Sequence, residues 1–561
     1  MKLKITITDG FNNIISCKIT IYQAVKEDKK QELVTLNTVY CDGICEFDFE
    51  KGQYKLEISR GKLYKPFNKI IELMEKEVEL DVILEEIVDT KALNLYSFDA
   101  HSHVSRDEVL ETGNLVTAST IMKGEDFNFF FAGSPYDHEV HLQYLNRNFT
   151  DKLPYRYKFK ETIEKVSNRS YILDIGNEIV KCRYGHAFMM NYLQKPPFSK
   201  YYDEEWDPWL FTKVGEEPAY SIAYMHEALL KERGENSIAA SAHPTSWWYH
   251  DNGEFITNIA STLGFEILAE SIDAMVVMGY ERDHKYYQEI WFDALKNGYF
   301  LPGIAETDAS FDNPPERILE FKTYAITTEF SIDSICNSVR EGRCIVSSGP
   351  IILMKVNGKP IGSVLKYFLG ESFELEIEAF RCFEAPLSKM QVLVNGNLYK
   401  QYNLGVDSIK INQRVVIEED SFILIKCYDA KGNLAMTNPV YIRNTPFLNR
   451  GYMSNITLKV SKAGKVANGK YWLDENNRKI SFDSKLQLIM KPSSKLYVEV
   501  EGQIKRIYLF ELPELQEIFK NLYLGLFNGN KFYKPGEVPA KEFKLARIRE
   551  ILNNVEIKLE F

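Results

Sequence analysis

The first 95 residues alternate between apolar and polar positions with a period of two, the pattern of β-strands that bury one face. The alternation is clearest in KLKITIT (2–8), CKITIYQ (17–23), CEFDF (45–49), YKLEIS (54–59) and VELDVIL (78–84). Turn signals such as Asp42-Gly43 and Lys51-Gly52 separate these runs. The pattern predicts a small β-sandwich over residues 1–95.

From about residue 96 the pattern changes to short apolar runs separated by helix-like segments. Two of these segments, residues 219–234 and 286–298, each close on a glycine suited to a helix C-terminus. Alternation of strands and helices predicts an α/β domain with a parallel sheet or barrel over residues 96–350.

Period-two alternation returns after residue 350, for example at 371–380, 389–396 and 420–430. It predicts a β-sandwich domain over residues 351–445 and a C-terminal β-rich domain over 446–561, which ends in helix-like segments at 511–523 and 542–554. A length of 561 residues fits three or four domains.

Composition narrows the class of protein. With 45% hydrophobic and 26% charged residues, the chain has an ordinary globular composition, and its net charge of -11 argues against a nucleic-acid-binding surface. No apolar run reaches the roughly 18 residues that span a bilayer, and the first ten residues lack a signal-peptide core. We therefore expect a cytoplasmic protein with no membrane or nucleic-acid partner, in which the eight cysteines, without a CxxC pair, are mostly buried thiols.

Four predicted strands of the middle domain run directly into residue types that bind metals. They are LNLYSFDAHSH (93–103), YILDIGNE (171–178), SIAASAHP (237–244) and YFLPGIAETD (299–308). In α/β barrels the carboxyl ends of different strands converge on the active site. The candidate ligands are therefore the residues at these ends: His101, His103, Glu178, His243 and Asp308.

Each candidate also has an ordinary structural explanation when it is considered alone. Glu178 could be a solvated loop carboxylate, His186 a packed histidine, His243 a turn residue before proline, and Asp308 a helix N-cap. Their convergence at strand ends favours a metal site. No GxxxxGK[ST] phosphate loop, GxSxG elbow or HExxH helix offers a competing chemistry.

The order of these motifs resembles the PHP (polymerase and histidinol phosphatase) metallohydrolases, and most closely their CehA/McbA branch. The resemblance rests on Asp99-x-His101-x-His103, Gly176-Asn177-Glu178, Gly185-His186, Ala242-His243-Pro244 and Asp308, with Gly124–Asn128 and Gly342–Pro350 around them, and covers at least residues 45–365. It implies a distorted (β/α)7 TIM-like barrel of PHP type, flanked by N- and C-terminal β-sandwich-like domains.

The resemblance also implies divalent metal ions such as zinc, manganese or iron. His101, His103, Glu178 and Asp308 would hold one ion, and Glu178, His186 and His243 a second, with Glu178 as the bridge. Ser310 stands where the family has a further histidine, so we expect two ions rather than three.

The function predicted from these residues is hydrolysis of a small-molecule ester, carbamate, amide or phosphoester by a metal-activated water. Asp308 and Glu178 are the predicted catalytic carboxylates, and the residues expected to contact substrate are Arg106, Arg183, Trp247 and Trp248. The alternative is a related chain that has lost activity and serves as a ligand-binding module, for example for carbohydrate. Neither interpretation fixes the oligomeric state.

Overall fold

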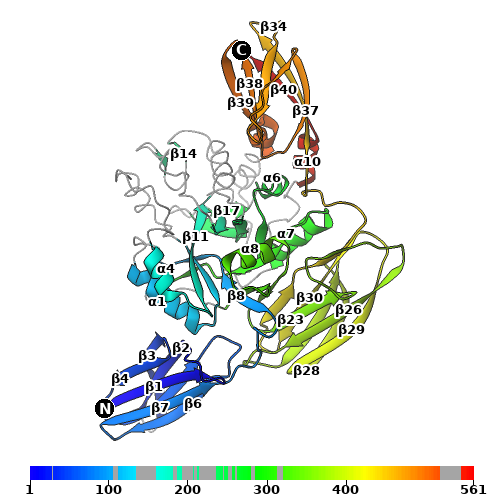
Figure 1. Ribbon diagram of the computed structural model, residues 1–561. Helices are drawn as coiled ribbons and strands as arrows, with labels where there is room; N and C mark the ends of the chain where they lie inside the picture. The colour runs from blue at the N-terminus through cyan, green and yellow to red at the C-terminus, as the bar shows by residue number, and fades with distance from the viewer. Residues whose placement is uncertain are drawn as a thin grey trace.

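The computed structural model shows four parts, a central one and three that flank it (Figure 1). The N-terminal sandwich lies at one end of the molecule, the C-terminal domain at the other, and the third domain beside the central domain. The described residues are 1–27, 30–104, 112–133, 159–180, 186–191, 206–207, 212–213, 236–243, 245–249, 255–259, 262–279, 285–311, 320–518 and 545–561.

The N-terminal part consists of two sheets that enclose one apolar core. One sheet has the order β4 (Ile44–Asp48), β1 (Lys2–Asp9), β7 (Glu77–Leu84), and the other β3 (Lys30–Cys41), β2 (Cys17–Glu27), β5 (Gly52–Ser59), β6 (Phe67–Leu73). Alternate side chains of β1, namely Leu3, Ile5 and Ile7, are fully buried. The strands predicted from period-two alternation in this region are confirmed.

The cysteines follow the prediction only in part. Five of the described cysteines are buried free thiols, Cys17, Cys336, Cys344, Cys382 and Cys427. Cys41 and Cys45, however, form a disulfide across the turn between β3 and β4. The expectation that most cysteines are buried thiols is therefore confirmed for the described residues, with Cys41 and Cys45 as the exception.

Eleven strands of the central domain belong to one hydrogen-bonded network. They are β8 (Leu95–Asp99), β9 (Ser102–His103), β10 (Phe129–Gly133), β11 (Ile172–Val180), β12 (His186–Met190), β15 (Ile238–Ala242), β18 (Ala274–Gly279), β19 (Gly303–Glu306), β20 (Ala309–Ser310), β21 (Lys322–Ile326) and β22 (Cys344–Ser347). Two short hairpins accompany them, β13 (Trp206–Asp207) with β14 (Thr212–Lys213), and β16 (Thr245–Tyr249) with β17 (Phe255–Ile259).

The predicted (β/α)7 TIM-like barrel is wrong. The described part of residues 96–350 has five α-helices, α1 (Thr112–Gly124), α4 (Lys160–Val166), α6 (Leu263–Leu268), α7 (Lys285–Lys296) and α8 (Ile332–Arg340), too few for seven β/α units. Strand β12 runs antiparallel between β11 and β15, and β21 runs antiparallel to β8. The barrel prediction failed because a short buried apolar run predicts a strand, but neither the direction of that strand nor the element that follows it.

Some helix predictions hold. The segment predicted at 286–298 is α7, and Gly298 beyond its end has a positive φ of 83°, as a C-terminal glycine requires. The segment predicted at 542–554 contains α10 (Leu545–Asn553). The helix predicted at 219–234 lies outside the described residues.

The third domain pairs directly with the central sheet. One of its sheets has the order β24 (Lys359–Pro360), β23 (Ile351–Val356), β26 (Glu371–Phe380), β29 (Ser408–Ile417). The other strands are β25 (Val364–Leu365), β27 (Leu387–Val394), β28 (Asn397–Val406), β30 (Ser421–Asp429), β31 (Leu434–Thr437) and β32 (Val440–Ile442). Because β31 pairs antiparallel with β22, the backbone hydrogen bonds cross the domain boundary.

The C-terminal domain has two sheets. They are β34 (Lys465–Val466), β33 (Ser454–Lys462), β37 (Lys485–Met490) with β40 (Asn554–Glu560), and β36 (Ile480–Phe482), β35 (Gly469–Leu473), β38 (Lys495–Val500), β39 (Gln503–Tyr508). A 3-10 helix, η3 (Leu509–Glu511), follows β39. The ring of Phe510 lies 5.0 Å from that of Phe265 in α6, so this domain packs against the central one.

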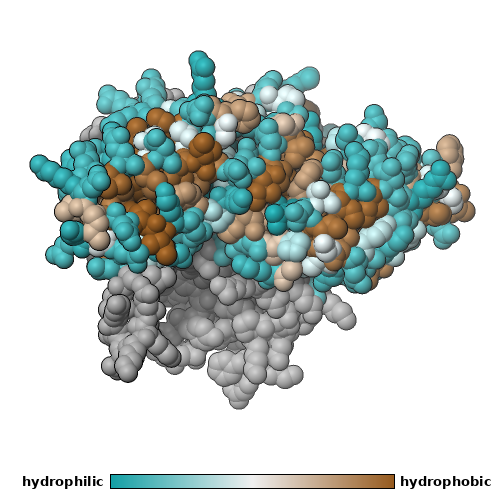
Figure 2. Space-filling view, turned by 90° about the horizontal axis from the view of Figure 1, so that it is seen from below, coloured by the Kyte–Doolittle hydropathy of each residue, from teal (hydrophilic) through white to brown (hydrophobic). Residues whose placement is uncertain are grey.

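The surface is mainly hydrophilic, with separate apolar patches on the face shown in Figure 2. Exposed apolar side chains include Ile70 and Ile83 of the N-terminal domain and Phe368 and Leu369 of the third. Scattered residues of this kind are normal on a folded protein. Within the described residues, the helices are too short or too polar to cross a bilayer.

Arg60 connects the N-terminal sandwich to the central domain. Its guanidinium donates to the carbonyl oxygens of Ser16 and Lys123, both at 2.7 Å, and lies 3.1 Å from a carboxylate oxygen of Asp126. Both charged side chains are largely buried, with exposed fractions of 12% and 13%. Such a pair holds its two elements in one orientation, because leaving either charge alone is costly.

We predict that Arg60→Met lowers the thermal unfolding midpoint, because it leaves the Asp126 carboxylate without its cation, a loss of about 3 to 5 kcal/mol for a buried pair. Differential scanning calorimetry measures the change. Lys4→Met is the matched control, since Lys4 pairs with Glu79 on the surface and such pairs contribute about 0 to 1 kcal/mol. Equal midpoints for the two variants would contradict the proposed role of Arg60.

Candidate metal centre

Three histidines and one aspartate meet at the ends of the central strands. A carboxylate oxygen of Asp308 lies 3.1 Å from His103 Nε2 and 3.8 Å from His101 Nε2, and the other lies 3.9 Å from His243 Nε2. Ligand atoms of His101, His243 and Asp308 all lie within 4.8 Å of one another. All four side chains are buried, with residue exposures of 2% to 6%.

The ligand side chains lie at or just after the ends of the central strands. His101 follows β8 by two residues, His243 follows β15 directly, and Asp308 follows β19 by two residues. The predicted positions of these three residues at strand ends are confirmed. Glu178 differs, because it lies inside β11 rather than beyond its end.

The backbone at Asp308 has an unusual conformation. Its φ is 46°, in the left-handed region that non-glycine residues rarely adopt. The amide of Asp308 donates to the carbonyl oxygen of His101 at 2.8 Å, which joins the two ligand segments. Such strain costs of order 1–3 kcal/mol and is typical of residues that a functional site holds in place.

Glu306 orients two of the histidine segments. One carboxylate oxygen lies 2.5 Å from His101 Nδ1, and the other accepts the backbone N–H of His243 at 2.9 Å. The side chain is fully buried. A carboxylate on one ring nitrogen fixes the imidazole tautomer and turns the other nitrogen towards a metal, so Glu306 presents His101 Nε2 to the cluster.

Asp99 supports the same loop from the other side. Its carboxylate accepts the Thr307 hydroxyl at 2.6 Å and the backbone amides of Thr307 and His101 at 3.2 and 3.3 Å. Asp99 is fully buried. These bonds fix the segments that carry His101 and Asp308 relative to each other.

Burial raises the pKa of the buried carboxylates Asp308 and Asp99, whereas neighbouring charges and hydrogen bonds lower it. Burial alone raises the pKa of Asp308, but the neighbouring His101, His103 and His243 outweigh it and hold that pKa well below its usual range. Burial raises the pKa of Asp99 to about 7, although hydrogen bonds from Thr307 and the His101 backbone amide oppose the rise. Asp308 is therefore suited to remain an ionised ligand.

Apolar side chains surround the cluster. The ring of Phe188 stacks on that of His101, with centroids 5.2 Å apart and planes at 24°. Phe98, Ala100, Ala240 and other buried residues of the central domain form the core around these rings. Such a dry environment strengthens electrostatic interactions between the ligands and any bound cation.

The donor set fits a transition metal ion. Imidazole nitrogens with a carboxylate oxygen are ligands of zinc, manganese and iron, whereas calcium and magnesium take mainly oxygen ligands. Three imidazoles converge on one ionised carboxylate here, and a carboxylate holds the second nitrogen of His101. His101, His103, His243 and Asp308 are therefore the residues that would hold an ion.

This arrangement changes the predicted division of ligands. His243 was expected at a second ion with Glu178 and His186, yet it lies in the same group as His101 and Asp308. Glu178 and His186 occur in neighbouring strands, β11 and β12, but their side chains lie outside the described part of the structure. The bridging role of Glu178 and the second ion remain predictions.

The predicted substrate contacts stay untested. Arg106 and Arg183 lie outside the described residues. Trp247 and Trp248 belong to β16, and their side chains are likewise not described. Ser310, at the position where a further histidine was sought, is buried in β20 and pairs by its backbone with His103.

Glu306 was not among the predicted site residues, although it holds the His101 ring and the His243 backbone in place. A signal was present, because Glu306 stands two residues before Asp308 at the end of an apolar strand. Asp99 bears the same relation to His101. A carboxylate two residues before a ligand is a pattern that could have identified both.

Comparisons with known proteins do not identify a family. No family model matches the chain, and no curated protein matches it. Matching solved structures include a variant of BcpA, the major pilin subunit of Bacillus cereus, at 6% identity with a TM-score of 0.22, covering 100% of this chain and 98% of that one. A β-glucuronidase of Parabacteroides merdae matches at 10% identity and a TM-score of 0.18, covering 88% and 73%.

These similarities are too low to support an inference about fold or function. They also leave the resemblance to PHP metallohydrolases untested, so that resemblance remains a prediction from motifs whose expected barrel the structure does not show.

We predict that Gly279→Ala disrupts the site through Glu306. Gly279 has a φ of 149°, and a Cβ added there would lie 2.3 Å from the Glu306 carbonyl oxygen and 2.8 Å from its Cγ. The variant should unfold at a lower temperature and bind less metal, measured by calorimetry and by elemental analysis. Gly405→Ala is the control, because an added Cβ meets nothing within 4 Å there. Unchanged metal content in Gly279→Ala would show that metal binding does not depend on the present position of Glu306.

Proposed function

We propose that this chain is a metal-dependent hydrolase whose ion is held by His101, His103, His243 and Asp308. The convergence of the three imidazole Nε2 atoms on the Asp308 carboxylate, at 3.1 to 3.9 Å, is the observation that carries the proposal. A set of His and carboxylate ligands is typical of catalytic sites, whereas closed structural zinc sites are usually rich in cysteine.

The buried carboxylates have different tasks in this proposal. Asp308 stays ionised beside the imidazoles and acts as a ligand and hydrogen-bond acceptor. Glu306 is a positioning residue, because it acts on the site through His101 and the backbone of His243. Asp99 supports the loop through the hydroxyl and the backbone amide of Thr307.

An ion bound here would lower the pKa of a coordinated water and polarise the oxygen of a carbonyl or phosphoryl group. The chain supplies a pre-oriented ligand set, since Glu306 and Asp99 fix His101, His243 and the Asp308 loop. It also excludes bulk water from the rings through Phe188 and its apolar neighbours. Glu178 remains the proposed second carboxylate, and a second ion with His186 remains part of the proposal.

The bond that is hydrolysed stays open among ester, carbamate, amide and phosphoester of a small molecule. A cytoplasmic location and the absence of membrane and nucleic-acid partners also remain proposals, based on composition and net charge.

We predict near-stoichiometric zinc, manganese or iron in the purified protein, measured by inductively coupled plasma mass spectrometry. Asp308→Asn, which keeps the shape but loses the charge, should weaken metal binding by at least about 100-fold, and Glu306→Gln by about 10- to 100-fold, as for residues that orient ligands. Competition with a chelator gives the affinities. Asp407→Asn, at an exposed ion pair with Arg381 in the third domain, is the control.

A folded native protein that binds none of these ions, or equal affinity in Asp308→Asn and Asp407→Asn, would refute the metal site. Circular dichroism establishes that each variant is folded.

We predict that the metal-loaded protein hydrolyses at least one member of a panel of p-nitrophenyl acetate, an aryl carbamate, an anilide and p-nitrophenyl phosphate. Chelation should abolish the activity and added metal restore it, because the ligand set acts through the ion. His103→Ala should reduce kcat/KM by at least about 100-fold, a barrier increase of about 2.7 kcal/mol. Metal-loaded protein that is inert towards the whole panel would instead favour the ligand-binding alternative.

A further inference from the structure

A large pocket lies where three domains meet, and none of the described residues that line it is a proposed metal ligand. It has a volume of about 780 Å³ and is lined by β2, β3 and β5 of the N-terminal sandwich, by α1 and β21 of the central domain, and by the third domain. This volume falls within the range of roughly 300–1,000 Å³ that is usual for small-molecule sites. Pockets between domains are common places for ligands.

The core packing separates this pocket from the proposed metal centre. Phe311, which lines the pocket, contacts the ring of Phe130 at 5.6 Å. Phe130 belongs to the core that includes α1 residues, whereas its neighbours Phe129 and Phe131 belong to the core around the metal ligands. Successive residues of β10 point to opposite faces, so Phe130, which packs against Phe311, faces away from the core around the metal ligands.

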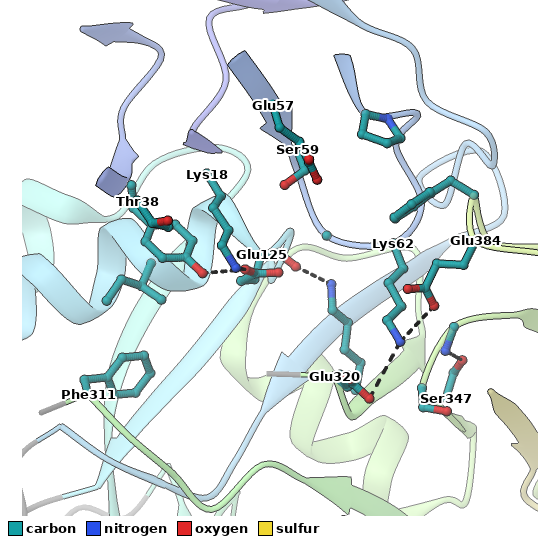
Figure 3. Close-up of a pocket in the computed structure, with 18 of the residues that line it drawn as sticks. Lys18, Thr38, Glu57, Ser59, Lys62, Glu125, Phe311, Glu320, Ser347 and Glu384 are labelled. Carbon is teal, nitrogen blue, oxygen red and sulfur yellow. Dashed lines mark hydrogen bonds and ion pairs between the residues drawn. The ribbon is translucent and has the colours of Figure 1, made fainter. Parts of the chain in front are cut away.

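Charged side chains of both signs line the pocket (Figure 3). The cations are Lys18, Lys62 and Lys322, and the anions are Glu57, Glu125, Glu320 and Glu384, so the formal sum is 3 − 4 = −1. A nearly balanced lining offers no strong attraction to a ligand with a large net charge of either sign. The lining therefore suits a neutral ligand.

Two of the three cations, Lys62 and Lys322, already donate hydrogen bonds within the protein. Lys62 Nζ donates to the side-chain oxygen Oδ1 of Asn433 at 2.9 Å and lies 3.2 Å from Glu384 and 3.7 Å from Glu320. Lys322 Nζ donates to the backbone carbonyl oxygens of Glu125 and Asp126 at 2.5 and 3.0 Å. An ammonium group has three donors, so these contacts use much of the donor capacity of Lys62 and Lys322. Lys18 lies 3.9 Å from a carboxylate oxygen of Glu125.

The carboxylates that line the pocket can accept further hydrogen bonds. An ionised carboxylate has about four acceptor positions. Glu125 accepts the hydroxyl of Tyr40 at 2.5 Å, and Glu57 lies 3.8 Å from Lys55. In Figure 3, Glu57 and Ser59 extend from β5 towards the space between Glu125 and Lys62. The pocket is thus rich in acceptors that a ligand could satisfy only by donating hydrogen bonds.

Apolar surface completes the lining. Ile121 of α1 and the rings of Phe311 and Phe383 are among the residues that line the pocket. A ligand that fits must combine several hydrogen-bond donors with C–H faces and carry no net charge. Hydroxyl groups are such donors, and each can also accept a hydrogen bond from Lys18 or Lys322.

We propose that this interdomain pocket binds a neutral polyhydroxylated molecule, a saccharide or polyol, through Glu57, Glu125, Glu320 and Glu384. The site is independent of the proposed hydrolytic centre and joins the N-terminal sandwich to the other two domains through a shared ligand.

Isothermal titration calorimetry on the full chain tests the proposal. The probes are glucose, maltose, cellobiose, xylobiose and myo-inositol, each at up to about 10 mM, where a complex of millimolar Kd is detectable. Gluconate and spermidine serve as an anionic and a cationic polar probe. At least one neutral probe should bind more tightly than both charged probes.

Two matched variants locate the site. Glu57→Ala should weaken saccharide binding by about tenfold or more, because it removes a charged acceptor. Glu72→Ala, on the adjacent strand β6 and outside the pocket, should leave binding unchanged. Because Glu57 is 39% exposed in its side chain, its removal should not unfold the domain.

Three outcomes would overturn the proposal: no heat from any neutral probe, tighter binding of gluconate or spermidine, or equal affinity in Glu57→Ala and the native protein. Treatment with a chelator should leave saccharide binding unchanged. Loss of binding on chelation would mean that the sugar occupies the metal centre instead, which also contradicts the assignment.

Discussion

A buried carboxylate facing three imidazoles is the interaction on which the central domain depends. Asp308 can remain ionised in an apolar interior only because His101, His103 and His243 converge on it. Each of these residues comes from the end of a different buried strand or from the turn that follows it. The central strands must therefore hold their ends in register, since a displacement of one would leave a charge buried without a partner.

Carboxylates outside this cluster maintain that register. Glu306 joins the His101 ring to the His243 backbone, and Asp99 joins Thr307 to the His101 backbone. These contacts hold the two loops that carry the ligands, and the carboxylates that make them are not themselves among the proposed metal ligands. Gly279 belongs to the same arrangement, because only a residue without Cβ leaves room for Glu306. The proposed catalytic geometry is thus a property of the surrounding buried network.

The flanking domains are joined to this network by specific contacts. Arg60 of the N-terminal sandwich binds Lys123 at the end of α1 and Asp126 in the loop that follows. Strand β31 of the third domain pairs with β22 of the central domain. Where the three domains meet, ion pairs and hydroxyl groups border a pocket large enough for a small ligand. The proposed hydrolytic site therefore lies within the central domain, whereas the proposed saccharide site depends on how the three domains meet.

The sequence by itself determined the local features. Period-two alternation located the strands of the N-terminal sandwich, and strand-end placement of polar residues located His101, His243 and Asp308, because both signals depend only on near neighbours in the chain. The tertiary structure alone decided the direction of β12 and β21, which made the predicted barrel wrong, and the pairing of Glu306 with His101 and His243. Strand direction and contacts between residues some 60 to 200 positions apart depend on packing between distant segments, which no local pattern records.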